Sequence, residues 1–346
     1  MRIVHVTTSV FGGAGLAAFR LHKTMLKGNY NSVLFSKTYE NKVLSCFKID
    51  HEMSNNIFRR KINSVLFKVD SFINKIYDSF NFEYHSSLRT NYRIHKYCKS
   101  NDIIILHWVA DFLDYKSFFT NIGQDSKIFL FVHDLNCVQG KLHTLFDKRK
   151  ITGKPIQIIE SYYQRKKLKY FRKIKNLKVI ANSDYTLKTL KNIGMFSNSS
   201  LYKIKLGIPN NELMPLDKKF AKKELGFEEN DFLILTSANN LDSELKGFQR
   251  YLNIINAFYI NKKIKFIGLG KTKSKVLLEK GNFYNFSTWD LNEKSMLFSA
   301  ADVTLSTSYE ETFGQTIIES YACSTPVIVY NNAALPELVH HCLLYT

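Results

Sequence analysis

Two glutamates near the end of the chain have a spacing that suits a phosphorylated sugar ligand. Glu311 and Glu319 lie eight positions apart, with Gly314 between them, after the short run 304–306. We expect that run to end a strand and Gln315–Ala322 to form a helix whose first N–H groups can bind phosphate. Such a junction suits a nucleotide-diphosphate sugar: one acid for sugar hydroxyls, N–H donors for the diphosphate and a second acid for the ribose.

Histidines follow two of the predicted buried strands. His133 and Asp134 come directly after one strand, and His107 and Trp108 directly after another. Ligand-binding groups gather at strand ends in open α/β sheets. A neutral His133 can hydrogen-bond a sugar hydroxyl, and a charged one can offset phosphate charge. His107 and Trp108 either form a wall of a binding site or pack in the core.

A lysine follows the first predicted strand of the second half. Lys246 and Gly247 come after a strand over 233–237 and a segment that contains Asn239 and Asn240. A lysine side chain can neutralise phosphate, whereas an asparagine side chain carries no charge and can only offer hydrogen bonds. The alternative is an ordinary solvated lysine.

Glycines occupy the loop that follows the first predicted strand. Gly12 and Gly13 lie within 7–15, before a helical pattern over 17–22. Glycine lets the backbone approach a ligand closely. The fingerprint Gly-x-Gly-x-x-Gly is absent, which disfavours an NAD enzyme. A plain strand-to-helix turn is the alternative interpretation.

Short apolar runs alternate with helical patterns along the whole chain, which predicts an α/β fold with parallel, doubly wound sheets. The sequence shows two such series, separated by a segment rich in Gly, Pro and Asn. We therefore predict an N-terminal Rossmann-like domain over 1–206, a linker over 207–215 and a C-terminal Rossmann-like domain over 216–346. The predicted strands are 2–7, 31–35, 103–106, 128–132, 179–181, 232–236, 264–267, 303–305 and 327–329.

Composition limits the class of partner. The chain has 346 residues and a formal net charge of +19, which favours nucleotide diphosphates, nucleic acid or an anionic membrane surface. No apolar run approaches the ~20 residues that span a bilayer. The five cysteines are scattered, which indicates neither structural zinc nor a disulfide framework and favours the cytoplasm.

The acidic segment, with Phe313-Gly314 inside it and Ala322 and Thr325-Pro326-Val327 after it, resembles the Glu-x7-Glu signature of the family 4 retaining glycosyltransferases. That family has the GT-B architecture, two Rossmann-like domains that face a cleft. Gly140, His143 and the Leu106–Trp108 strand end are similar to those of members that make bacterial surface polysaccharides of the colanic-acid type. The chain departs from that pattern at 135–137 and 141–142, which bears on acceptor choice.

The resemblance assigns roles to individual residues. The catalytic candidates are His133, Lys246 and Glu311. The donor-binding candidates are Gly12, Gly13, Asn239, Asn240, Lys246, Phe313, Gly314, Gln315, Thr316 and Glu319, and the acceptor-binding candidates are His107, Trp108, Asp134 and His143. The family usually has an arginine where this chain has Asn239 or Asn240.

The family chemistry implied is a retaining transfer by front-face attack, in which the departing diphosphate takes the acceptor's proton. The donor is expected to be a UDP- or GDP-sugar, with no metal or other cofactor. Two basic, amphipathic segments, 57–76 and 162–173, suit an anionic membrane surface and a lipid-linked oligosaccharide acceptor, although a solvated face on a basic protein is the alternative. We expect a cytoplasmic protein, peripheral on the inner face of the plasma membrane, and no nucleic-acid partner because no recognition module is present.

Two rival hypotheses remain open. An inactive GT-B remnant, at most a binding subunit, is favoured by the absent arginine and by an end at 343–346 that predicts a truncated second domain. A nucleotide-sugar epimerase is disfavoured, because the Gly-x-x-Gly-x-x-Gly loop and the Tyr-x3-Lys pair are not found in their places.

Overall fold

The computed structural model of the chain divides into two compact units. One comprises Met1–Asn182 and Thr186–Ile204, and the other comprises Ser183–Tyr185 and Lys205–Thr346. The residues described are 1–38, 45–50, 57–79, 82–85, 90, 92–123, 125–288 and 290–339, with the backbone alone for 57–67.

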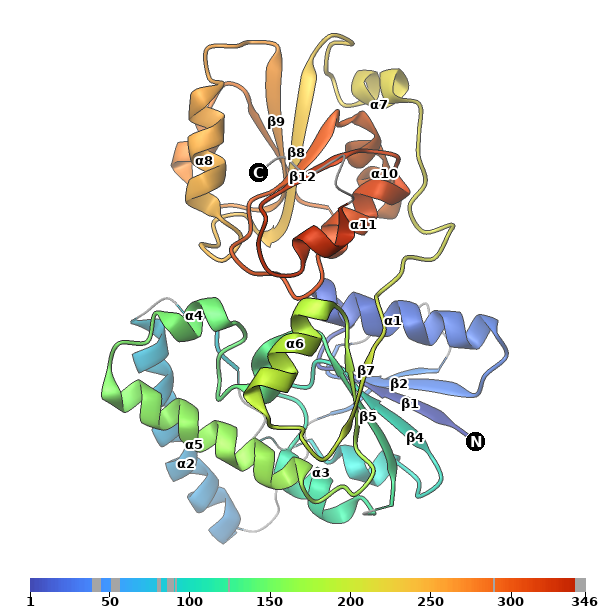
Figure 1. Ribbon diagram of the computed structural model, residues 1–346, viewed down its shortest axis with the longest axis vertical. Coiled ribbons are helices and arrows are strands. Elements are labelled where there is room, and N and C mark those ends of the chain that lie inside the picture. The colour runs from blue at the N-terminus through green and yellow to red at the C-terminus, as the bar shows by residue number, and fades with distance from the viewer. Residues whose placement is uncertain are drawn as a thin grey trace. The chain divides into compact units, whose positions relative to one another are not determined.

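The first unit is built on a seven-stranded parallel sheet in the order β3-β2-β1-β4-β5-β6-β7. The chain lays strands outward from β1 in one direction and then, from β4, in the other, so the order reverses between β1 and β4 (Figure 1). Ligands of such sheets bind outside the carboxyl ends of the strands at this reversal. The strands are β1 (Ile3–Val6), β2 (Ser32–Ser36), β3 (Cys46–Lys48), β4 (Ile103–Leu106), β5 (Lys127–Val132), β6 (Lys178–Ala181) and β7 (Ser200–Lys203).

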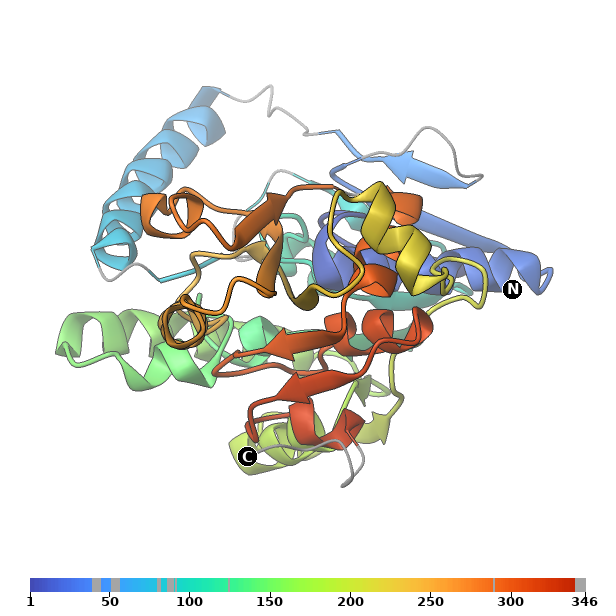
Figure 2. The same cartoon turned by 90° about the horizontal axis from the view of Figure 1, so that it is seen from above.

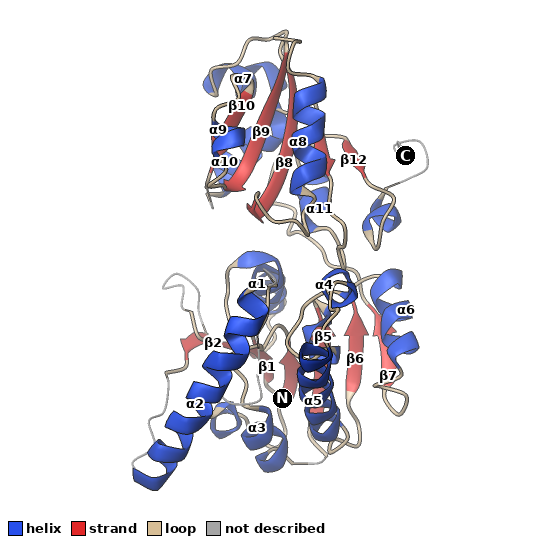
Figure 3. Cartoon of the chain, turned by 90° about the vertical axis from the view of Figure 1, so that its left-hand side faces the viewer, coloured by secondary structure: helices blue, strands red, loops and turns tan. Residues whose placement is uncertain are grey.

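Helices of the first unit pack on this sheet through an apolar core that contains Val4, Ile104 and Leu130. Two of them, α2 and α5, lie on the same side of the sheet (Figures 2 and 3), and the Tyr163 hydroxyl of α5 donates to Asp70 of α2 at 2.9 Å. The helices are α1 (Gly12–Lys27), α2 (Ile57–Asp78), α3 (Tyr115–Asn121), α4 (Leu145–Arg149), α5 (Lys154–Phe171) and α6 (Asp184–Ile193), with short 3-10 turns η1 (Ile94–Tyr97) and η2 (Leu135–Val138).

The second unit repeats the design with a five-stranded parallel sheet in the order β10-β9-β8-β11-β12. Here the order reverses between β8 and β11. The strands are β8 (Phe232–Asn240), β9 (Ile264–Lys271), β10 (Phe283–Phe286), β11 (Val303–Ser306) and β12 (Val327–Val329), and the helices are α7 (Lys218–Glu224), α8 (Phe248–Ala257), α9 (Lys275–Leu278), α10 (Leu291–Ala300), α11 (Gln315–Ala322) and the 3-10 turn η3 (Leu335–Leu338).

The predicted α/β class with two doubly wound parallel sheets is confirmed, and all nine predicted strands are present. The sequence missed β3, β7 and β10, which have exposed residues and therefore lack a continuous apolar run. It also ended β8 too early: the strand continues to Asn240, which pairs with Lys271 of β9 after an irregularity in the register.

Two other predictions concern parts of the chain that the structure does not describe. The side chains of 57–67 in the first basic segment, and residues 343–346 at the end of the chain, lie outside the described residues. Among the described helices, none is both long and apolar enough to cross a membrane.

Candidate functional site

The two loops that flank the strand reversal of the second unit are held tightly together. The N–H of Tyr309 donates to the carbonyl of Leu245 at 2.8 Å, and the Thr307 hydroxyl donates to the carbonyl of Lys246 at 2.9 Å. Gly247, the N-cap residue directly before α8, has φ +76°, and a Cβ built on it would lie 2.0 Å from the Thr307 carbonyl oxygen. Only glycine accepts both this backbone conformation and this close approach.

This contact brings Lys246 and Glu311 together. The Lys246 ammonium lies 2.7 Å from Glu311 Oε1, which also accepts a hydrogen bond from the Ser308 hydroxyl at 2.9 Å. The side chains are 34% and 21% exposed, so both groups remain within reach of a ligand. A carboxylate and an ammonium at one strand reversal supply an acceptor for sugar hydroxyls and a cation for phosphate.

A stacked arginine supports the loop that carries Glu311. The Arg250 guanidinium of α8 stacks 3.7 Å from the ring centre of Tyr309 and 4.2 Å from that of Tyr330, and it donates to the Thr307 carbonyl at 3.3 Å. Stacking between two rings fixes a guanidinium strongly. Sequence reasoning did not identify Arg250 or Tyr330, because their partners are distant in the chain.

The helix predicted after the first glutamate is α11, and it begins after Gly314, whose φ is +99°. Gln315 and Thr316 form its half-buried first turn, at the helix end whose dipole favours anions. Phe313, which was predicted to bind the donor, is 3% exposed and packs inside the unit.

Glu319 is buried, whereas Glu311 is partly exposed. It lies in the second turn of α11, is 5% exposed and makes an ion pair with Lys294 of α10 at 2.9 Å. A buried carboxylate needs such a partner, because burying an unpaired charge is costly. Lys294 has no motif around it that could have predicted this contact from the sequence.

Strand β8 ends with two asparagines, which stand where the family usually has an arginine. Asn239 and Asn240 are exposed, and Asn240 Oδ1 accepts a hydrogen bond from the N–H of Asp242 at 3.1 Å. Their amides therefore supply hydrogen bonds without charge at this edge of the sheet.

In the first unit, the predicted glycines lie where the first loop enters α1. Gly12 has φ +75°, and a Cβ at Gly12 or Gly13 would meet no atom within 4 Å. Gly15 is the glycine required by packing, since its Cβ would lie 2.2 Å from the Ser9 carbonyl oxygen. The open space over Gly12 and Gly13 is compatible with a ligand close to the backbone.

Three buried histidines form a line across β1, β4 and β5. His107 Nε2 lies 3.0 Å from His5 Nδ1, and His107 Nδ1 lies 2.9 Å from His133 Nε2. His5 Nε2 contacts the sulfur of Met25 at 3.3 Å. Since a thioether only accepts, His5 donates to it, His107 donates to His5, and His133 donates to His107.

Burial keeps these histidines neutral. It lowers the pKa of His5 to about 3 and that of His133 to about 4, and it holds the pKa of His107 well below its usual value. Of the two sequence-based alternatives for His133, the structure therefore favours a neutral imidazole. His5 was not predicted, because it lies inside a strand and no spacing marks it.

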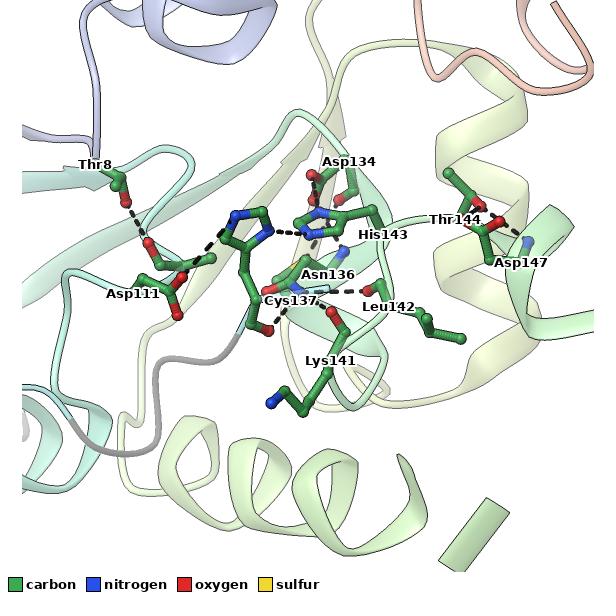
Figure 4. A network of polar contacts seen from close by, with 12 residues as sticks. Thr8, Asp111, Asp134, Asn136, Cys137, Lys141, Leu142, His143, Thr144 and Asp147 are labelled. Atoms are coloured by element: carbon green, nitrogen blue, oxygen red, sulfur yellow. Dashed lines mark hydrogen bonds and ion pairs between the residues drawn. The ribbon is translucent and has the colours of Figure 1, made fainter. Parts of the chain in front are cut away.

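The other predicted residues of this unit form a second polar cluster (Figure 4). Asp134 accepts hydrogen bonds from the N–H of Asn136 at 2.9 Å and from His143 Nδ1 at 2.7 Å. Burial alone would raise the pKa of Asp134, but His143 and the N–H of Asn136 lower it below its ordinary value. Trp108 lies beside His143, with 5.8 Å between ring centres.

The loop that carries His143 is fixed by buried groups. Glu160 accepts from the N–H groups of Gly140 and Lys141 at 2.9 and 2.6 Å, and Lys167 donates to Asn136. Burial lowers the pKa of Lys167 to about 8. Lys141 is one of the departures from the surface-polysaccharide pattern. Its ammonium lies over the rings of Tyr77, Tyr84 and Tyr163, which accounts for a lysine at this position.

Comparisons with known proteins show which family part of the chain resembles. Residues 217–342 match the model of the family described as "Glycosyl transferases group 1". A protein described as an uncharacterized 41.2 kDa protein in the cps region of Klebsiella pneumoniae is 29% identical over 168 residues, which cover 46% of this chain and 44% of that protein. The chain thus spans less than half the length of this curated relative.

Solved structures share the fold. Anabaena HepE, solved with UDP and glucose, has a TM-score of 0.62 at 16% identity, covering 100% of this chain and 86% of HepE. WaaG, a glycosyltransferase involved in lipopolysaccharide biosynthesis, has a TM-score of 0.60 at 12% identity, covering 97% and 83%. These likenesses confirm the predicted GT-B fold, and the family match confirms the predicted resemblance.

The contact between the two loops of the second unit predicts unequal effects of alanine at two left-handed glycines. Gly226 has φ +77° and open space around its Cβ, so Gly226→Ala should cost about 1–2 kcal/mol. Gly247→Ala should cost about 2–5 kcal/mol, because overpacking adds about 1–3 kcal/mol. Urea unfolding measures both, and equal losses would show that the approach of Gly247 to Thr307 imposes no constraint.

The buried ion pair predicts a second result. Lys294→Met should lower the free energy of unfolding by about 3–5 kcal/mol, because Glu319 is left buried without its cation. The double variant Lys294→Met/Glu319→Leu should recover most of that loss. Lys219→Met, which breaks an exposed ion pair with Glu229, should leave the urea midpoint unchanged. If the double variant were no more stable than the single one, charge burial would not explain the loss.

Proposed function

We propose that this chain, a group 1 glycosyltransferase with the GT-B fold, moves a sugar from a nucleotide-diphosphate sugar to a growing bacterial surface glycan with retention of configuration. The observation that carries this proposal is the pair Lys246–Glu311, fixed at the strand reversal of the second unit and open to a ligand. The relatives add support: HepE was solved with UDP-glucose, WaaG is involved in lipopolysaccharide biosynthesis, and the curated relative lies in a cps region.

The donor site follows from the chemistry of the second unit. Lys246 and the first turn of α11 would stabilise the negative charge that builds on the diphosphate as it leaves. Glu311 would hold sugar hydroxyls. Glu319 would contact the ribose only from the edge of the buried site, while its carboxylate stays paired with Lys294.

The reaction needs little covalent chemistry from the protein. The acceptor oxygen forms a bond to the anomeric carbon on the face from which the diphosphate departs. The electron pair of the broken bond stays on the phosphate, and a phosphate oxygen takes the acceptor's proton. The protein supplies positioning and charge stabilisation.

The acceptor is proposed to be lipid-linked, with the protein peripheral on the inner face of the plasma membrane. Supporting this, α2 and α5 carry exposed apolar residues among their basic ones, with Phe72 at 67% and Ile158 at 68% exposure. The net charge of +19 favours an anionic surface.

Donor binding tests the proposal. Titration calorimetry of UDP- and GDP-sugars should show one nucleotide class binding to the wild-type chain. Lys246→Gln should weaken binding about 10- to 100-fold, because it removes a charged hydrogen bond to the diphosphate. Glu311→Gln should weaken binding of the nucleotide sugar while leaving binding of the free nucleoside diphosphate unchanged.

Lys219→Gln, an exposed lysine on α7, is the matched control and should bind as the wild type does. A folded, monodisperse sample that binds neither UDP- nor GDP-sugars would contradict the proposal. That result would favour the alternative, an inactive binding subunit, for which the uncharged Asn239 and Asn240 are the structural argument.

Metal independence is the remaining proposal about this chemistry. Lys246 and the α11 N-terminus supply positive charge where the diphosphate would lie, so donor binding should be the same in EDTA and in added Mg²⁺ or Mn²⁺. Calorimetry in both buffers measures it, and affinity that depends on the metal would overturn it.

A further inference from the structure

A chain of hydrogen bonds leads from partly buried Asp134 to a half-exposed histidine that sequence reasoning did not identify. His143 Nδ1 lies 2.7 Å from Asp134 Oδ2, and His143 Nε2 lies 2.7 Å from His85 Nδ1. His85 Nε2 then lies 3.9 Å from Asp111 Oδ2. Figure 4 shows the labelled members, Asp134, His143 and Asp111, arranged along this path.

The Asp134 carboxylate fixes the direction of the hydrogen bond to His143, and the tautomer of His143 sets the direction of the next one. A carboxylate only accepts, so His143 carries its proton on Nδ1. In the tautomer that carries its proton on Nδ1 alone, His143 accepts at Nε2, and His85 then donates from Nδ1. Neutral His85 is left with a lone pair on Nε2, facing Asp111.

The backbone holds His85 in this place independently of its ring. The N–H of His85 donates to the Lys141 carbonyl at 2.9 Å, and its carbonyl accepts from Asn136 Nδ2 at 3.2 Å. The neighbouring Tyr84 pairs with Leu142 in an antiparallel bridge. His85 is therefore preorganised, as a binding group should be.

Two hydrogen-bond acceptors and an aromatic ring meet at this point. The side chains of His85 and Asp111 are 40% and 43% exposed, so a ligand can reach both. The Trp108 ring lies 5.1 Å from that of His85, centre to centre. Asp111 adopts a left-handed φ of +55°, a conformation that few residue types accept without cost.

We propose that His85, Asp111 and Trp108 form a subsite for a sugar of the acceptor. A sugar presents hydroxyl donors to His85 Nε2 and the Asp111 carboxylate, and an apolar ring face to an aromatic side chain. The subsite rests on the proposed function in one respect, that the acceptor is a saccharide. Within that function, His85 is an acceptor-binding residue, and Asp134 and His143 are the residues that position it.

Protonation of His85 should close the subsite. Its cationic form would pair with Asp111 and lose the lone pair that accepts the hydroxyl. The groups facing the ring are His143, Asp111, Asp134 and Glu83; burial and His143 lower the pKa of His85, while the three carboxylates raise it. Because the pKa is lowered on balance, sugar binding should be complete at neutral pH and fall in acid.

Nuclear magnetic resonance of the full chain with ¹⁵N-labelled histidine tests this subsite. At pH 7.5 the His85 ring should carry its proton on Nδ1, and free methyl glycosides at millimolar concentration should shift its Nε2 resonance. The shift should disappear in acid, and the resonance itself should be absent from the spectrum of His85→Gln, which assigns it to His85. His95→Gln, a partly buried histidine of η1, should respond as the wild type does.

Each failure has its own meaning. A proton on His85 Nε2 at pH 7.5, or no response to any glycoside, would overturn the subsite even if nucleotide sugars bind to the second unit. A response that saturating nucleotide sugar abolishes would assign the subsite to the donor's sugar and overturn its acceptor role. A glycoside response without nucleotide binding would retain the subsite and contradict the proposed function instead.

Discussion

The proposed donor site depends on one close backbone contact, the approach of Gly247 to the Thr307 carbonyl. This contact, with the hydrogen bonds of Thr307 and Tyr309, joins the loops that follow β8 and β11. Without it, Lys246 and Glu311 would lie on two independent loops, and their 2.7 Å ion pair would have to be ordered by the ligand. Folding therefore includes the entropic cost of bringing these opposite charges together, before any ligand binds.

The two glutamates of the acidic motif illustrate how burial divides similar residues. Glu311 is held by Lys246 and Ser308 yet remains open, whereas Glu319 is sealed against Lys294. An open carboxylate can exchange its partner for a ligand hydroxyl at little cost, while a sealed one cannot give up its cation without a large penalty. The motif therefore combines one group suited to binding with one suited to stability.

In the first unit, atoms that can only accept hydrogen bonds govern the histidines. The sulfur of Met25 sets the direction along His5, His107 and His133, and the carboxylate of Asp134 sets it along His143 and His85. Each chain begins at an acceptor inside the unit, so the tautomer of the last histidine is decided several residues away. Single-residue reasoning about His133 or His143 could not have found this.

The amino-acid sequence was enough to predict the α/β class, the central strands, the glycine-led helix after Glu311 and the resemblance to group 1 glycosyltransferases, because these depend on local periodicity and on motifs within one segment. Tertiary structure alone decided that Glu311 pairs with Lys246, Glu319 with Lys294 and His143 with His85. It also decided the edge strands β3, β7 and β10, whose exposed residues give no apolar signal. Pairings between distant segments depend on how parallel strands are ordered in a sheet, and no local pattern encodes that order.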